Sequence, residues 1–128
     1  MEIKFIQEKS QKCPGIYYDP ADNLLTIEGR SIPENPDIIY QPVKDWIEEY
    51  FSDSDSLNIK FVLEYINSGS SKHLLDVLKI FRAYYRQGKK LRIRWLYEED
   101  DEAIFELGEH FRDTSGLPIE IEMMIEGR

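Results

Sequence analysis

The sequence predicts a single α/β domain over residues 1–128, in which helices pack against one mixed β-sheet of five or six strands. Its 128 residues lie at the commonest size of a single domain. The content of 41% hydrophobic and 32% charged residues is typical of a folded chain with one core. After an opening hairpin, segments with the two-residue period of strands alternate with segments of helical period, which favours parallel strands joined by helical crossovers.

The first third of the chain has the pattern of β-strands. Residues 3–6 and 15–18 are rich in β-branched and aromatic side chains. The residues at 19–23 form a cluster of turn formers, after which residues 24–28 alternate as the returning strand of a hairpin.

The first helix has a recognisable start. Asn35 is a favourable N-cap, and Pro36 suits the first helical position because its missing N–H has no helical partner there. Pro42 conflicts with an uninterrupted helix, so the helix is expected either to begin near Ile39 or to be kinked at Pro42. One helical face would then carry Ile39, Val43, Trp46, Ile47 and Tyr50.

Residues 58–67 predict a central strand with apolar side chains on both faces, as expected of an interior strand that is covered on both sides. The helix that follows is expected to begin near Ser70 and to end at Gly88, a favourable left-handed cap. The pattern then predicts a strand over residues 91–97, a helix from about Asp100 to Gly116 and a last strand over residues 119–125. The full order is β-β-β-α-β-α-β-α-β.

The net charge of −9 is distributed unevenly along the chain. Residues 77–97 contain seven basic and no acidic residues, whereas residues 98–128 contain eleven acidic and two basic residues. We expect the basic helix face and strand to lie near the acidic C-terminal helix and to neutralise it. The overall acidity would repel a phosphate backbone, so no nucleic-acid partner is expected.

Other features point to a reduced, cytoplasmic protein. No stretch approaches the roughly 18 apolar residues of a membrane span, and no signal-peptide pattern is present, so no membrane association is expected. The single cysteine, Cys13, cannot form an internal disulfide. His73 and His110 lack metal-ligand spacing, and the acidic run at 98–102 lacks the pattern of a calcium loop. We therefore expect no metal, no cofactor and no catalytic residue.

The segment Asn67-Ser68-Gly69-Ser70-Ser71-Lys72 is the best candidate for a functional site. It joins the carboxyl end of the predicted central strand to a helix N-terminus, the edge at which open α/β sheets bind ligands. Unpaired backbone N–H groups and the helix dipole would stabilise a phosphate there. A second interpretation stays open, in which Ser68 or Ser70 only caps the helix. The segment is not a Walker A loop, because His73 follows Lys72.

Four further segments carry a family resemblance: Gly29-Arg30-Ser31-Ile32-Pro33-Glu34-Asn35, Tyr40-Gln41-Pro42-Val43, Trp46-Ile47-Glu48-Glu49-Tyr50 and Arg92-Ile93-Arg94-Trp95-Leu96-Tyr97. Together with Glu64-Tyr65-Ile66 and the Asn67–Lys72 segment, this pattern resembles the SiaC family of regulatory phosphoproteins. The resemblance covers the chain from about residue 17 to about residue 125. It implies a STAS-like fold, that of the anti-sigma-factor antagonists.

The resemblance also implies a partner-switching function without enzymatic activity. A serine/threonine kinase would phosphorylate Ser68, a metal-dependent protein phosphatase would remove the phosphate, and the unphosphorylated form would bind an effector such as a diguanylate cyclase. Where the family prefers Thr and then Ser, this chain has Ser68 and Gly69, so Ser70 and Ser71 remain alternative acceptors. An alternative function is that of a binding domain that senses a nucleotide or anion without covalent modification.

Overall fold

The computed structural model describes residues 2–125, and these form one six-stranded sheet with three helices. The chain begins with three strands: β1 (Lys4–Gln7), β2 (Gly15–Asp19) and β3 (Leu24–Ser31). The rest alternates between helices and strands: α1 (Pro36–Tyr50), β4 (Ser56–Ile66), α2 (Ser68–Arg86), β5 (Lys90–Tyr97), α3 (Glu102–Ser115) and β6 (Ile119–Met123). The predicted fold class and element order are confirmed.

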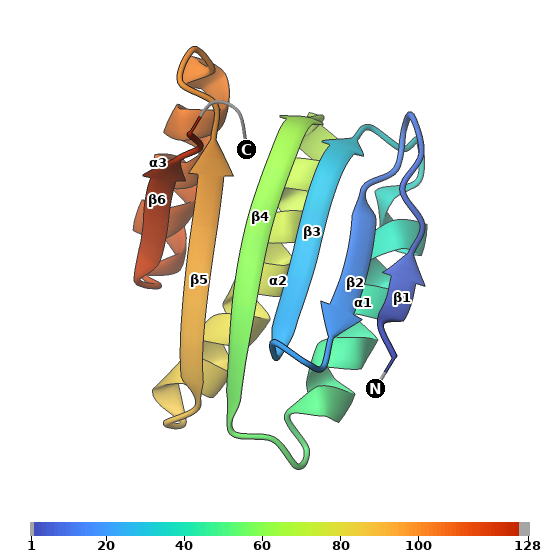
Figure 1. Ribbon diagram of the computed structural model, residues 1–128, viewed down its shortest axis with the longest axis vertical. Coiled ribbons are helices and arrows are strands. Elements are labelled where there is room, and N and C mark those ends of the chain that lie inside the picture. Colours follow the sequence, from blue (N-terminus) through green and yellow to red (C-terminus); the bar gives the residue numbers. More distant parts are fainter. Residues whose placement is uncertain (1, 126–128) are drawn as a thin grey trace.

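The strands follow one another across the sheet in chain order, β1 to β6 (Figure 1). The pairs β1–β2 and β2–β3 are antiparallel, whereas β3–β4, β4–β5 and β5–β6 are parallel. Each parallel pair is joined through one helix. Because such crossovers are right-handed and all advance in the same direction, they place every helix on the same face of the sheet.

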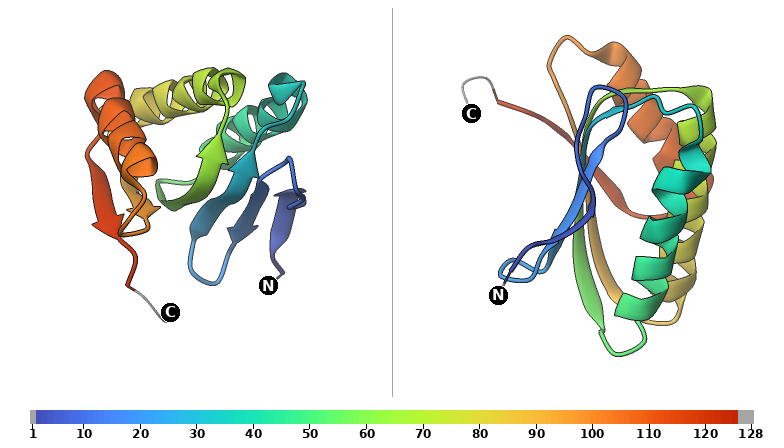
Figure 2. Two further views of the ribbon diagram at one scale, coloured as in Figure 1. Left: turned by 90° about the horizontal axis from the view of Figure 1, so that it is seen from above. Right: turned by 90° about the vertical axis from the view of Figure 1, so that its right-hand side faces the viewer.

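All three helices therefore cover one face of the sheet and leave the other open (Figure 2). The expectation that β4 is covered on both faces was wrong. On its helix side β4 buries Leu57, Ile59, Phe61 and Leu63, whereas Val62 on the open side is only half-buried. Flanking strands rather than a second helical layer cover Val62 in part.

The core lies between the sheet and the helices, and Trp95 is the largest of its fully buried side chains. The indole N–H of Trp95 donates a hydrogen bond to the carbonyl of Ile104 at 2.9 Å. Its ring contacts Phe61 and Phe111 and lies against Gly108. A Cβ at position 108 would lie 2.5 Å from indole Cδ1, so this contact requires glycine. Trp95 thus joins β5 to α3.

The helix starts differ from the predicted ones in two places. α1 begins at Pro36, as the Asn35-Pro36 pair predicts, although the Asn35 side chain makes no capping hydrogen bond. It continues through Pro42, because burial of Ile39, Tyr40, Val43 and Ile47 outweighs the one hydrogen bond that Pro42 cannot donate. α2 begins two residues earlier than predicted, at Ser68. α3 begins at Glu102, after a cap in which Asp101 Oδ1 accepts from the N–H of Ile104 at 3.1 Å.

Two pairs of opposite charges from the basic and acidic stretches meet within the sheet. On its open face Arg92 pairs with Glu120 at 3.2 Å, and Arg94 pairs with Glu122 at 2.9 Å. The hydrogen bond from Arg94 lowers the pKa of Glu122. The expectation that the C-terminal helix neutralises the basic strand was wrong. The basic strand β5 is neutralised by the C-terminal strand β6, which is its parallel neighbour.

Candidate functional site

The candidate acceptor segment lies at the carboxyl end of β4, at the edge of the sheet where the parallel strands β3 to β6 all end (Figure 1). Asn67 directly follows β4, and Ser68 is the first residue of α2. β4 is an inner strand between β3 and β5. The structure thus places Ser68 where open parallel sheets present their functional groups, as predicted.

Asn67 fixes the position of this segment through three hydrogen bonds. Its side-chain Oδ1 accepts from the N–H of Ser70 at 2.9 Å and so caps α2. Its backbone N–H donates to the carbonyl of Ser31 at 3.0 Å, and its Nδ2 donates to the carbonyl of Pro33 at 3.4 Å. Asn67 therefore ties the segment at residues 67–72 to the segment at residues 29–35, two motifs that are far apart in the sequence.

The three serines of the segment lie in different environments. Ser68 is exposed, Ser71 is half-buried, and Ser70 is fully buried. Ser70 Oγ lies 2.9 Å from Ser31 Oγ, which in turn lies 2.6 Å from the hydroxyl of Tyr40. Among the three candidate acceptors, Ser68 is the most accessible to another protein.

The buried chain of hydroxyls contains two residues that sequence reasoning did not assign to the site, Ser31 and Tyr40. Ser31 ends β3, and Tyr40 lies in α1. Burial raises the pKa of Tyr40 to about 12, so its hydroxyl stays protonated and keeps a proton to donate. Both residues belong to the motifs that carry the family resemblance, and these motifs were the signal in the sequence that could have assigned them to the site.

The remaining predicted residues surround Ser68. Lys72 is exposed one helical turn after Ser68, on the same face of α2. Gly69 is exposed beside α1, and a Cβ there would lie 3.3 Å from Cγ of Pro36. The ring of His73 stacks on that of Tyr40, with centroids 6.1 Å apart and an interplanar angle of 9°. His73, which lacks metal-ligand spacing in the sequence, is a packing partner of the buried hydroxyl chain.

The electrostatics at the start of α2 favour an anion. The cap by Asn67 uses the N–H of Ser70, and the N–H of Ser71 donates to the carbonyl of Asn67 at 2.9 Å. The N–H groups of Ser68 and Gly69 are left at the positive end of the helix dipole. Over residues 2–125 the structure contains no group of three side chains that could hold a metal ion. This geometry suits a phosphate on Ser68 Oγ.

The fold is that of a small α/β domain with an exposed serine at the capped start of a helix. A family model described as "SiaC family regulatory phosphoprotein" matches residues 6–124, nearly the whole chain. The chain therefore belongs to the SiaC family. No helix in the described part of the chain is long and apolar enough to cross a membrane.

Similar proteins occur in Pseudomonas aeruginosa. An uncharacterized protein of strain UCBPP-PA14 is 31% identical over 114 residues, which cover 88% of this chain and 90% of that protein. The crystal structure of apo-SiaC matches with a TM-score of 0.84 and 29% identity, covering 95% of this chain and 99% of that one. A chain in the crystal structure of the diguanylate cyclase SiaD with its activator SiaC matches with a TM-score of 0.85 and 29% identity, covering 92% of this chain and 98% of that one.

Replacing Asn67 tests how the segment is held. Asn67→Ala should lower the free energy of unfolding by about 2 kcal/mol, because it removes a helix cap of about 1 kcal/mol and the bond to Pro33. Asp101→Ala is the matched control: it removes the cap of α3 alone and should cost about 1 kcal/mol. Urea denaturation measures both values. An equal loss in the two variants would show that the bond to Pro33 contributes nothing.

Proposed function

We propose that this chain is a partner-switching protein of the cytoplasm, controlled by phosphorylation of Ser68. A serine/threonine kinase transfers a phosphoryl group to Ser68 Oγ, and a metal-dependent phosphatase removes it by hydrolysis. The unphosphorylated form binds an effector protein, a diguanylate cyclase, and the chain itself catalyses no reaction. The observation that carries this proposal is the exposure of Ser68 at the capped start of α2, while Ser70 next to it is buried.

The proposed effector class is supported by a relative. SiaC of Pseudomonas aeruginosa is described as the activator of the diguanylate cyclase SiaD, with which it forms a complex. The similarity to this structure extends over nearly the full length of both chains. We extend the activator function to the present chain on this basis.

The local chemistry explains how a phosphate would change binding while the fold is kept. A phosphoserine adds about −1.5 to −2 charges at pH 7. At the start of α2 this charge meets two free N–H groups, the positive end of the dipole and the ammonium of Lys72, so the phosphate should cost the fold little. Toward a bound partner, the same charge would repel an acidic surface and would disrupt an apolar contact made next to Ser68. Two large apolar side chains, Ile38 and Tyr65, are exposed near this edge.

Binding to the effector tests the proposal. Unphosphorylated protein should bind a purified cognate diguanylate cyclase at least fivefold more tightly than protein phosphorylated stoichiometrically by its kinase, as expected of a coupling of about 1–3 kcal/mol. Isothermal titration calorimetry measures both affinities. A circular dichroism spectrum that is unchanged on phosphorylation shows that the fold is kept. Equal affinities of the two forms would contradict the switch.

The same preparations test the alternative of a nucleotide or anion sensor. Such a sensor would be stabilised by about 2.7 kcal/mol at a ligand concentration 100 times its dissociation constant. We expect no such stabilisation of the unmodified protein by phosphate, ATP or GTP in thermal unfolding. A large shift with one of these ligands, together with an unmodified Ser68 after the kinase reaction, would favour the sensor.

A further inference from the structure

The sheet ends in an open edge at β1, whereas the acceptor segment follows β4, an inner strand. β1 pairs with β2 on one side, and no described strand pairs with its other side (Figure 1). The outer N–H and C=O groups of β1 are thus available for hydrogen bonds. On the open face of the sheet, Phe5 of β1 is 62% exposed, and Ile3 just before it is 44% exposed.

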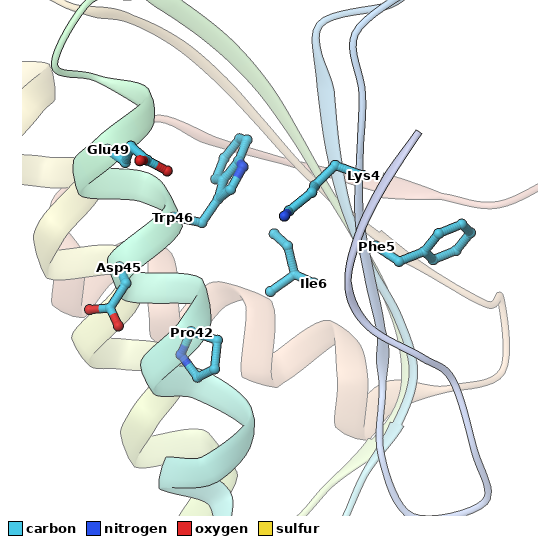
Figure 3. Close-up of a pocket in the computed structure, with 7 residues that line it drawn as sticks. All are labelled: Lys4, Phe5, Ile6, Pro42, Asp45, Trp46 and Glu49. Atoms are coloured by element: carbon cyan, nitrogen blue, oxygen red, sulfur yellow. The ribbon is translucent and has the colours of Figure 1, made fainter. Parts of the chain in front are cut away.

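On the helix side of β1, a groove of about 450 Å³ separates this strand from α1 (Figure 3). Ile6 forms its apolar strand wall, and Pro42 and Trp46 form its apolar helix wall. The ring of Trp46 is held in place by stacking on Tyr50 at a centroid distance of 4.9 Å. The groove is therefore a preformed space with a firm aromatic wall.

The helix rim of this groove is rich in hydrogen-bond acceptors. Asp45 and Glu49 are exposed, lie four residues apart on α1 and line the groove together. Pro42 has no N–H to donate to the carbonyl of Ile38. Lys4 on the strand wall is the one basic residue among those that line the groove, so the two carboxylates leave it acidic.

We propose that the edge of β1 is a docking site for an extended, basic segment of a partner protein, which adds to the sheet as a further strand. Its backbone would pair with β1, an arrangement in which main-chain hydrogen bonds give affinity and alternate side chains give specificity. Side chains on one face would enter the groove, with an apolar group between Ile6 and Trp46 and Lys or Arg against Asp45 and Glu49. Side chains on the other face would cover Phe5.

Two observations support this occupant over the alternatives. An added strand would cover the exposed ring of Phe5 on the open face and the half-buried Ile6 in the groove, whereas a helix in the groove would leave Phe5 and the strand edge exposed. A second copy of this chain paired through β1 would bring its own acidic α1 next to the first, and the carboxylates would repel one another. The site shares no residue with the acceptor segment and does not depend on phosphorylation of Ser68.

The test uses a nine-residue peptide, blocked at both ends, whose one face carries Lys, Leu, Leu and Lys and whose other face carries Val and Thr. Titrated into ¹⁵N-labelled protein, it should shift the amide signals of β1 and the indole N–H signal of Trp46, and should slow hydrogen exchange at the edge of β1. The double variant D45N/E49Q should weaken binding about fivefold. The matched control D53N/D100N changes the net charge equally at exposed positions outside the groove and should bind within about twofold of the unmodified protein.

Two further peptides separate the contributions of backbone and charge. A version N-methylated at alternate residues cannot form the main-chain hydrogen bonds to β1 and should not bind. A version with Glu in place of Lys should bind at least tenfold more weakly than the original peptide. Amide spectra of the variants confirm that they are folded. The proposal is overturned if the signals of β1 do not move at millimolar peptide, if the N-methylated peptide binds equally well, or if D45N/E49Q and D53N/D100N have the same effect. Dimerisation through β1 in sedimentation experiments would also overturn it.

Discussion

Ser68→Ala should abolish phosphorylation by the cognate kinase, as measured by intact mass and phosphopeptide mapping. The reason is accessibility: Ser68 is exposed at the start of α2, whereas Ser70 is buried against Ser31 and Tyr40. Kinase chemistry needs the acceptor oxygen in line with the transferred phosphoryl group, which a buried hydroxyl cannot provide without local unfolding. The loss should be complete, since no rate is expected without the acceptor hydroxyl.

The stability of this variant should hardly change. The helix is capped by Asn67 and not by Ser68, so Ser68→Ala removes an exposed hydroxyl with no structural role. We expect a change in the free energy of unfolding of less than about 0.5 kcal/mol. Loss of phosphorylation therefore cannot be attributed to unfolding.

Three further variants are the controls for Ser68→Ala. Ser68→Thr keeps a hydroxyl at the same place and should keep phosphorylation, and Ser71→Ala should be modified as the unaltered protein is. Ser70→Ala should still be phosphorylated on Ser68 but should lose stability, because it breaks the buried hydroxyl chain. Phosphate found on Ser70 or Ser71 in Ser68→Ala would move the acceptor along the segment. If the kinase leaves the unaltered segment unmodified, the proposed switch is wrong.

Trp95→Ala should cause the largest loss of stability of any single change described here, about 4 kcal/mol. Trp95 is the largest fully buried side chain, and its indole fills the space between β5 and α3 where Gly108 leaves room. Its removal leaves a cavity lined by Phe61 and Phe111 and removes the hydrogen bond to Ile104. For a domain of this size, the melting temperature should fall by about 15 °C.

Trp46→Ala is the matched control, because it removes the same side chain from a half-buried position in α1. It should cost about half as much, and urea denaturation followed by circular dichroism measures both changes without relying on the tryptophan signal. Trp95→Phe keeps an aromatic ring in the core and should fall between Trp95→Ala and the unaltered protein. A smaller loss for Trp95→Ala than for Trp46→Ala would contradict the central position of Trp95 in the core.

The sequence alone determined the order of the elements and the place of the acceptor segment. Both depend on local patterns: the two-residue period of apolar side chains in β5, the helical period of apolar side chains in α1 and α2, and the Asn35-Pro36 pair at the start of α1. The position of Ser68 after an inner strand followed from that order, since the carboxyl ends of parallel strands lie at the edge where helices begin. Phosphorylation of Ser68 and the STAS-like classification stay predictions.

The tertiary structure alone decided features that depend on contacts between distant segments. The sequence favours Ser68 only through the family resemblance and leaves Ser70 and Ser71 as alternatives. The contacts of Ser70 with Ser31, and of Ser31 with Tyr40, bury Ser70, whereas Ser68 stays exposed. Likewise, packing of α1 on the sheet outweighs the local preference of Pro42 against a helix. The strand order also decides that β6 neutralises β5 and that all helices lie on one face of the sheet. The sequence could not predict these features, because the periodicity of a single strand does not show which strands pair with it.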